Sequence, residues 1–240
     1  MPLFSLPVPA RATSVQRGFR CERKYYLTPG DALTLRQRVA WLLRPDRHAQ
    51  NGPYHISSLY FDDLYDTALR QKQCGALVRD KWRLRWYDGA TEKARLERKH
   101  KCGDLSRKDQ VWLAPEQFRR LCRGDFGCAA GEQAPVWRAF YAAWLRAGLR
   151  PVVQVDYDRE AFSYAPGNVR VTFDSGLRAA RPGSAVLLPV QTDGLTILEL
   201  KYDGFLPDAA ARLFSGMEMT QLAISKYVMA RFCLMEHGFS

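Results

Sequence analysis

The chain has 240 residues, of which 47% are hydrophobic and 25% are charged, with 36 Lys and Arg against 25 Asp and Glu. This composition excludes a disordered tail and a low-complexity polybasic run, and the basic excess predicts an anionic partner. No stretch approaches about 18 consecutive apolar residues, and the first ten residues lack the basic and apolar regions of a signal peptide. The sequence therefore predicts a folded cytoplasmic protein without a transmembrane segment of its own.

Alternation of apolar and polar residues predicts strands along most of the chain. Asp88 and Gly89, and then Gly103 and Asp104, separate successive strands at positions where glycine tolerates the positive φ of a hairpin turn. Neighbouring strands are therefore expected to be antiparallel. The eight predicted strands cover residues 19–27, 54–61, 77–87, 93–101, 105–113, 152–164, 169–174 and 195–202.

Helices are predicted where apolar residues recur at spacings of three and four. Four segments fit, at residues 31–43, 115–122, 134–149 and 219–236. The chain has no internal repeat, no Ser/Gly linker and no shift in composition, so we expect one α+β domain over residues 1–240. Its core should span about residues 19–236, with residues 1–17 as a flexible N-terminal segment.

The charged residues follow the strand alternation. In residues 81–86 basic side chains alternate with Trp and Leu, and Arg95, Glu97, Lys99 and Lys101 occupy one face of the next strand. Successive side chains of a strand point to opposite faces, so each strand presents a row of charges on one side. An ordinary sheet would expose that row to water. Here the apolar row is large enough to pack under helices, which would enclose the charged face.

Rows of like charge on neighbouring strands repel one another unless an anion lies between them. An eight-stranded antiparallel sheet closed on itself has room for one small ligand, and a lumen of Lys and Arg favours a linear chain of phosphates. Glutamates interspersed in these rows, such as Glu22 and Glu97, indicate a divalent metal, because a hard cation takes carboxylate and phosphate oxygens together.

Eight short segments resemble, in order and on elements of the right type, the VTC domain, which is the polyphosphate polymerase branch of the CYTH-like triphosphate tunnel metalloenzymes. The resemblance spans roughly residues 19–232 and implies an antiparallel eight-stranded closed tunnel flanked by helices. It implies transfer of the γ-phosphoryl group of ATP to a growing polyphosphate chain, with manganese or magnesium as cofactor. The segments are residues 22–24, 56–62, 83–87, 96–99, 157–159, 170–174, 198–201 and 225–227.

The resemblance also implies roles for individual residues. Glu199 falls where the family binds its metal, and the strand pattern adds Glu22 and Glu97 as further metal candidates. The expected catalytic residues are Arg83, Arg85, Lys99, Arg159 and Lys226. The other expected phosphate-binding residues are Lys24, Lys72, Lys108, Tyr157, Arg170, Lys201 and Ser225.

One segment departs from the hydrolytic relatives, which carry an E-x-E-x-K strand. Here Arg20 stands in place of the first glutamate, which argues against metal-assisted hydrolysis. Two alternatives remain open: a metal-dependent tripolyphosphatase or nucleoside triphosphatase, and a non-catalytic polyphosphate or polyanion-binding module. Nucleic acid is not expected as a partner, because many basic residues follow strand alternation. Membrane export of the product would need a membrane-protein partner.

Several polar residues outside these rows have a structural interpretation. His55 and His100 are not needed as acid or base, since the attacking phosphate is already ionised. Asp62, Asp63 and Asp66 follow the second predicted strand and are interpreted as a turn and helix cap.

Overall fold

The computed structural model of the chain describes residues 20–46, 48–49, 52–103 and 105–239. The predicted flexible segment 1–17 lies outside the described residues. Ten strands occur in the described part of the chain: β1 Arg20–Leu27, β2 Arg44–Pro45, β3 Tyr54–Asp62, β4 Val78–Tyr87, β5 Ala90–Cys102, β6 Leu105–Trp112, β7 Arg150–Tyr164, β8 Val169–Ala180, β9 Leu188–Pro189 and β10 Thr196–Tyr202. The α-helices are α1 Pro29–Leu42, α2 Thr67–Gln73, α3 Pro115–Cys122, α4 Pro135–Ala147, α5 Asp208–Ala211 and α6 Lys226–Glu236.

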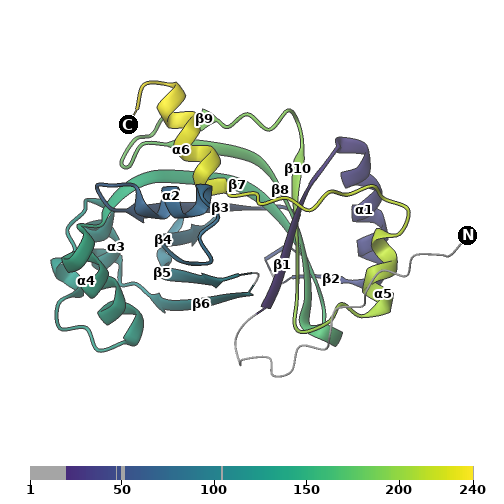
Figure 1. The fold of residues 1–240 in the computed structure, drawn as a ribbon, viewed down its shortest axis with the longest axis horizontal. Helices are drawn as coiled ribbons and strands as arrows, with labels where there is room; N and C mark the ends of the chain where they lie inside the picture. The colour runs from purple at the N-terminus through teal and green to yellow at the C-terminus, as the bar shows by residue number, and fades with distance from the viewer. Residues whose placement is uncertain (1–19, 47, 50–51, 104, 240) are drawn as a thin grey trace, which may run out of the picture.

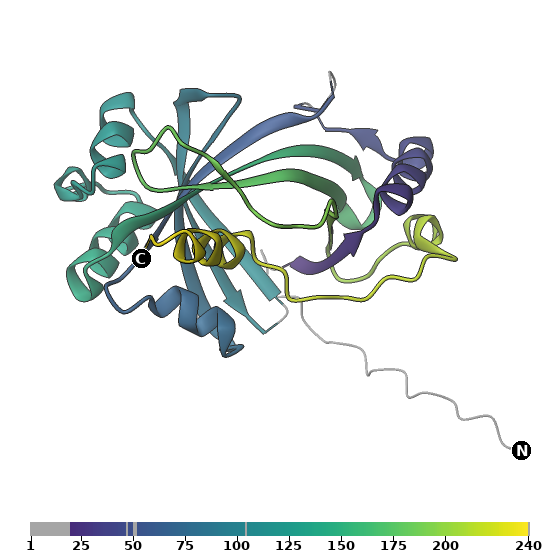
Figure 2. The same ribbon diagram turned by 90° about the horizontal axis from the view of Figure 1, so that it is seen from above.

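Eight of these strands pair in a ring. Their order is β7-β3-β4-β5-β6-β1-β10-β8, every pairing is antiparallel, and β8 pairs again with β7. The short strands β2 and β9 lie outside this order: β2 pairs with β7, and β9 pairs with β8. Among the described residues, the β1–β6 pairing is the shortest contact of the ring, with Arg20 opposite Ser106 and Cys21 opposite Leu105. Figures 1 and 2 show the ring from two sides, with helices around it.

The β4–β5 hairpin has the turn that its sequence predicts. Asp88 and Gly89 have φ values of 48° and 75°. Positive φ at both central residues matches the right-handed twist of the flanking strands, and glycine adopts it without the steric cost of a Cβ atom. The predicted antiparallel arrangement of these strands is confirmed.

The apolar faces of the strands are covered by helices, as the alternation predicts. Trp82, Leu84 and Trp86 of β4 are buried in a cluster with residues of α3 and α4. On the other side of the ring, Leu198 and Leu200 of β10 belong to a cluster that includes residues of α1. In Figure 1, α3 and α4 lie beside β4–β6, and α1 lies beside β1 and β10. Burying both apolar faces outside the ring leaves the charged faces to line its interior.

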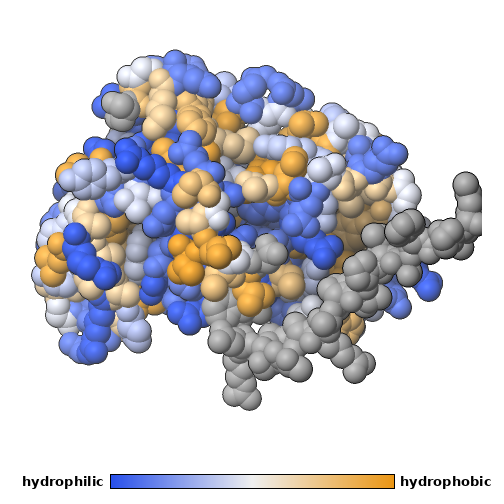
Figure 3. All heavy atoms as spheres, in the orientation of Figure 1, coloured by the Kyte–Doolittle hydropathy of each residue, from blue (hydrophilic) through white to orange (hydrophobic). Residues whose placement is uncertain are grey.

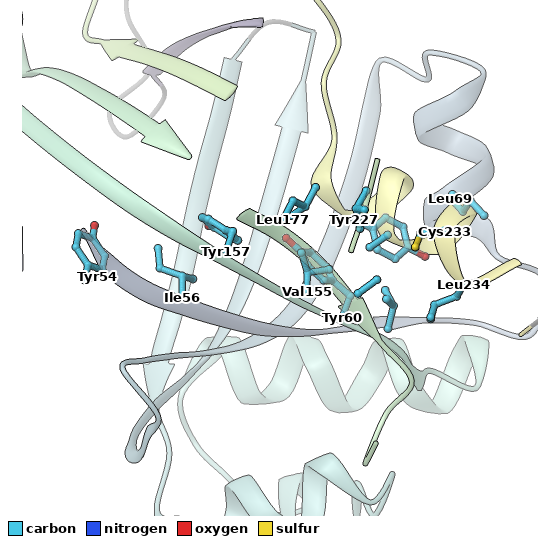
Figure 4. Close-up of a cluster of buried hydrophobic side chains, with 14 of the residues drawn as sticks. Tyr54, Ile56, Tyr60, Leu69, Val155, Tyr157, Leu177, Tyr227, Cys233 and Leu234 are labelled. Atoms are coloured by element: carbon cyan, nitrogen blue, oxygen red, sulfur yellow. The ribbon is translucent and has the colours of Figure 1, made fainter. Parts of the chain in front are cut away.

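The C-terminal helix α6 forms a third cluster with β7 and β8. Tyr227, Cys233 and Leu234 pack near Val155 and Leu177, as Figure 4 shows. This packing fixes the N-terminal end of α6, and with it Lys226, over the interior of the ring.

The helix predicted over residues 219–236 is wrong in its first part, because α6 begins only at Lys226. Residues 218–225 contain no helix or strand, and the Leu222 N–H donates a 2.9 Å hydrogen bond to the carbonyl of Lys24. Leu222 is 43% exposed, so the apolar period here does not mark a buried helix face. The contact with β1 gives this segment a backbone partner that local periodicity could not reveal.

Several other elements also differ from the prediction. The structure adds α2 and α5, which are too short to show a helical period. It also continues β8 from Asp174 to Ala180, where Gly176 has a φ of 61° and the β7–β8 register shifts between Asp156 and Asp158. Such a bulge interrupts strict alternation, which is why the sequence pattern stops early. Among the described helices, none has the length and apolar content needed to cross a bilayer.

Candidate active site

The interior of the ring holds a cavity of about 560 Å³. Eleven basic side chains and two carboxylates line it, so its lining is strongly cationic. Leu77 and Leu222 mark its opening, since both line the cavity and are 73% and 43% exposed. Apolar patches lie among hydrophilic areas on the face drawn in Figure 3. The basic lining residues are Lys24, Lys72, Arg79, Lys81, Arg83, Arg85, Lys99, Lys101, Arg159, Lys201 and Lys226.

Most of the residues singled out from the sequence meet in this cavity, although they come from seven strands or helices and one connecting segment. Those that line it are Glu22, Lys24, Lys72, Arg83, Arg85, Lys99, Tyr157, Arg159, Glu199, Lys201, Ser225 and Lys226. Their roles in binding or catalysis remain predictions.

Three of the predicted residues do not line the cavity. Arg170 lies at the start of β8 and donates to Asp46 over 2.6 Å and to the hydroxyl of Tyr54. Glu97 is fully buried and binds Arg83, while Lys108 lies 3.3 Å from a Glu97 oxygen. The carboxylate of Glu97 is thus already neutralised by two basic side chains, and it does not share a site with the other glutamates.

The two carboxylates of the cavity come from β1 and β10, which pair so that opposite charges face each other. Lys24 lies opposite Glu199, and Glu22 lies opposite Lys201. The ammonium group of Lys24 is 3.0 Å from Glu199 and 3.5 Å from Glu22, and Lys99 is 2.6 Å from Glu22. Opposite charges in direct cross-strand register stabilise a sheet, and here they also order the cavity wall.

Glu199 is the most densely paired of these carboxylates. Lys24 and Lys201 each lie 3.0 Å from it, Lys226 lies 3.2 Å away and Arg159 lies 3.7 Å away. Burial alone raises the pKa of Glu199, but the positive charges of Lys201, Lys24, Lys226 and Arg159 outweigh it and hold the pKa well below its ordinary value. Glu199 is therefore ionised at neutral pH.

Another buried carboxylate beside the cavity, Asp174, was not among the predicted site residues. It accepts two hydrogen bonds from Arg159, at 2.6 and 2.7 Å, and lies 2.5 Å from the ammonium group of Lys226. The sequence places Asp174 at the end of one of the resembling segments, but only the fold shows that it fixes the direction of Arg159 and Lys226. A bidentate contact of this kind restricts the guanidinium to one orientation.

The two arginines of β4 differ in their partners. Arg83 binds Glu97 at 2.7 Å and the hydroxyl of Tyr60 at 3.0 Å. Burial lowers the pKa of Arg83, but Glu97 more than reverses this effect, so the guanidinium stays charged. Arg85 has only neutral hydrogen-bond partners among the described residues, the hydroxyls of Ser58 and Tyr157 at 3.2 and 3.0 Å. The positive charge of Arg85 is therefore less compensated than that of Arg83, and it is more available to an incoming anion.

The carboxylates of the cavity wall suit a hard divalent ion whose remaining ligands would be phosphate oxygens of a substrate. No group of three or more His, Cys, Asp or Glu side chains in the described residues could hold a metal by itself. Glu22 and Glu199 nevertheless both reach the ammonium group of Lys24, so their oxygens lie on one part of the wall. Magnesium is commonly bound through one or two carboxylates together with substrate phosphates and water. Glu22 and Glu199 fit this arrangement, whereas Glu97 does not.

The structural interpretation of the remaining polar residues agrees with their contacts. His55 lies between Asp156 and Asp158, at 3.0 and 2.9 Å, outside the cavity lining. Asp62 accepts hydrogen bonds from the backbone of Ala68 and Leu69 at the start of α2. The predicted turn and cap are confirmed for Asp62 and for Asp63, which accepts from the N–H groups of Tyr65 and Thr67, whereas Asp66 makes no capping hydrogen bond and binds Arg231 instead.

Other proteins resemble the chain at two levels. Residues 19–235 match the family model of the VTC domain. Among solved structures, a Pyrococcus horikoshii protein aligns with 13% identity and a TM-score of 0.44 over 91% of this chain and 99% of its own. Candidate adenylate cyclases from Vibrio parahaemolyticus and Bacillus halodurans align with 13% identity each, with TM-scores of 0.43 and 0.44, over 82% of this chain and 83% and 86% of theirs. No curated protein gives a match.

Proposed function

The chain belongs to the VTC domain family, and on that premise we propose that it is a polyphosphate polymerase that uses ATP as its phosphoryl donor. The observation that carries the proposal is the cavity inside the ring, whose basic side chains far outnumber its carboxylates. A linear phosphate chain supplies many negative charges in a narrow shape, which matches such a lining. A tunnel that opens at both ends of the ring is part of this proposal.

In the proposed reaction, an oxygen of the terminal phosphate of the polyphosphate chain forms a bond to the γ-phosphorus of ATP. The bond between that phosphorus and the oxygen bridging to the β-phosphate breaks, and ADP leaves with the electron pair. The chain grows by one phosphate, and no oxidant or water is consumed. The acceptor oxygen is already ionised, so no side chain has to remove a proton.

Catalysis in this scheme rests on position and charge. Arg85, Arg159 and Lys226 would bind the equatorial oxygens of the transferred group, and their charges would stabilise the negative charge spread over it. Asp174 and the ring hold two of these side chains in fixed directions. A divalent ion held by Glu22 and Glu199 would neutralise further charge on the phosphates.

The test is incubation of the purified protein with ATP and Mn²⁺, with separate measurement of polyphosphate, ADP and free phosphate. We expect one ADP to be released for each phosphate that is added to polyphosphate. Release of ADP and free phosphate without polyphosphate would instead identify a hydrolase. Tight binding of tripolyphosphate without any turnover of ATP would identify a non-catalytic binding module. Lys93→Met, on an exposed position of β5 outside the cavity lining, is a control that should keep full activity.

A further inference from the structure

Trp112, at the end of β6, is a large aromatic side chain that stays outside the apolar clusters. Its chain neighbours Val111 and Leu113 pack into the cluster under α3 and α4, so Trp112 points to the inner face of the ring. There it lies opposite Arg95 of β5, and 59% of its surface is exposed. This part of the wall is at the far end of β4 and β5 from Leu77, which marks the opening of the cavity.

A row of planar groups leads up to Trp112. The guanidinium carbon of Arg95 lies 4.7 Å from the centre of the Trp112 ring and 5.0 Å from the centre of the Tyr87 ring. The ring of His48 stacks on Tyr87, with centres 5.6 Å apart and planes inclined by 9°. His48, Tyr87, Arg95 and Trp112 thus form a stacking row that ends at an exposed indole. A guanidinium against an aromatic face is held by cation–π attraction, so the row fixes the orientation of Trp112.

The positive charge of this row is uncompensated. Arg95 forms no ion pair with a carboxylate in the part of the chain that the structure describes, and its shielded Nε atom has no hydrogen-bond partner there. Its Nη1 atom makes one long contact, of 3.4 Å, with the side chain of Gln110. A cation behind an exposed indole favours a ligand that is planar and also carries negative charge, and nucleotides combine these two properties.

The distance from Trp112 to the cavity suits a nucleotide. Lys99 lines the cavity and lies opposite Lys108, which is four residues before Trp112 on β6. Because a strand rises about 3.3 Å per residue, Trp112 is about 13 Å along the wall from that pair. An extended nucleoside triphosphate can bridge such a span, with its base at one end and its terminal phosphate at the other. The wall between is accessible, since Lys108 and Gln110 are both exposed.

We infer that Trp112 and Arg95 form a stacking site for the base of a nucleotide, with the base on the exposed face of the Trp112 ring. Stacking engages the π face that every base has, so the site selects a nucleotide over inorganic polyphosphate without distinguishing adenine from guanine. The inference gives the donor nucleotide a direction, with its base at Trp112 and its γ-phosphate toward the cavity. It rests on the proposed function only in that the triphosphate lies inside the ring.

The first test compares Trp112→Ala with the matched control Trp41→Ala, which removes an exposed tryptophan from α1. Calorimetric titration without metal uses ATP, GTP and tripolyphosphate, the last of which has no base. We expect Trp112→Ala to weaken the binding of ATP and GTP by about fivefold or more, the effect of losing one stacked base, and to change tripolyphosphate affinity less than about twofold. Trp41→Ala should leave all three affinities unchanged. Unchanged ATP affinity in Trp112→Ala would overturn the inference, and so would equal losses for ATP and tripolyphosphate.

Adenosine tests the site without any phosphate. In saturation-transfer NMR, the base protons of adenosine should receive saturation from the wild type and from Trp112→Phe, which keeps a stacking ring, but not from Trp112→Leu, which keeps only apolar volume. No transfer from the wild type, or equal transfer from Trp112→Leu, would contradict a stacking site. These two variants also replace Trp112→Ala in the titrations if it does not fold, and failure of all three to fold would make Trp112 structural and end the proposal. Because adenosine has no phosphate and no turnover is measured, the result does not depend on whether the protein is a polymerase.

Discussion

Glu199 should affect both the stability of the protein and its affinity for an anionic substrate, and the substitution Glu199→Gln separates the two effects. Without substrate it compensates Lys24, Lys201 and Lys226, and with an anionic substrate it opposes the ligand unless a cation lies between them. We predict that Glu199→Gln lowers the melting temperature of the protein without anion, because three ammonium groups each lose one of their counter-charges.

The same variant should bind tripolyphosphate more tightly without metal, while the gain in affinity that Mn²⁺ gives the wild type disappears. Calorimetry with and without Mn²⁺ measures both effects. An unchanged response to Mn²⁺ would remove Glu199 from the metal site and leave it as an ion-pair partner only.

Because Arg83 and Arg85 have different partners, we predict that substitution by Met has different effects at the two positions. Arg83→Met leaves the fully buried Glu97 with Lys108 alone, and breaking a buried ion pair costs about 3–5 kcal/mol of the free energy of unfolding. Arg85→Met loses only hydrogen bonds to the hydroxyls of Ser58 and Tyr157, which costs about 1–3 kcal/mol.

We therefore expect Arg85→Met to stay folded and to lose tripolyphosphate affinity, whereas Arg83→Met is chiefly destabilised. Urea unfolding and tripolyphosphate titration of both variants check this. Equal stability of the two variants would show that Glu97 does not depend on Arg83.

His55 predicts a pH dependence of stability that has its origin outside the cavity. Burial lowers the pKa of His55, but the hydrogen bonds from its ring to Asp158 and Asp156 outweigh this and raise the pKa above its ordinary value of 6.5. The stabilisation is therefore complete below pH 6.5 and is lost as pH rises through the higher pKa of the folded state. In His55→Gln this contribution is absent at every pH. The difference in unfolding free energy between wild type and variant should shrink as pH rises, and a constant difference would contradict the assignment.

At the scale of single elements, β4 shows how one strand serves both core and site. Its Leu84 is fully buried under α3 and α4, while Arg83 and Arg85 line the cavity. We predict that Leu84→Asp destabilises the fold by about 4 kcal/mol or more, since it buries a carboxylate without a partner. Leu84→Met should cost less than about 1.5 kcal/mol and serves as the control. A Leu84→Asp protein that melts like the wild type would mean that the two faces of β4 are reversed.

The elements that the sequence predicts well are those whose side chains alternate without interruption. The β4 and β5 patterns identify which side chains face the interior, because strand geometry fixes their direction locally. The start of α6 could not be predicted, because the Leu222 N–H bonds to a carbonyl of β1, far away in the chain. Lys81 has the same alternation as Arg83, yet its lack of a counter-ion depends on which residues three other elements bring beside it. Alternation thus predicts the direction of a side chain but not its neighbours.

At the scale of the whole molecule, we expect the ring to separate small anions from large ones. The basic residues of the site face inward, where the proposed linear phosphate chain would reach them and a nucleic acid duplex would not. We predict that tripolyphosphate binds at about 0.15 M salt while duplex DNA binds only at low salt, through the general positive charge of the surface. Fluorescence anisotropy with labelled DNA and competition by tripolyphosphate measure both. Duplex binding as tight as tripolyphosphate binding at that salt concentration would contradict an enclosed site.

The pairing of β1 with β10 has a consequence for how the protein is made. Leu27 lies opposite Thr196, so the first strand leaves the ribosome long before its partner is synthesised. Contacts between residues so far apart in sequence raise the contact order and slow folding. Until β10 arrives, Lys24 of β1 lacks Glu199, the carboxylate of β10 that later compensates its charge. In the proposed function a phosphate chain binds the completed ring and not its parts, so its presence in the cell would favour the last step of folding by mass action.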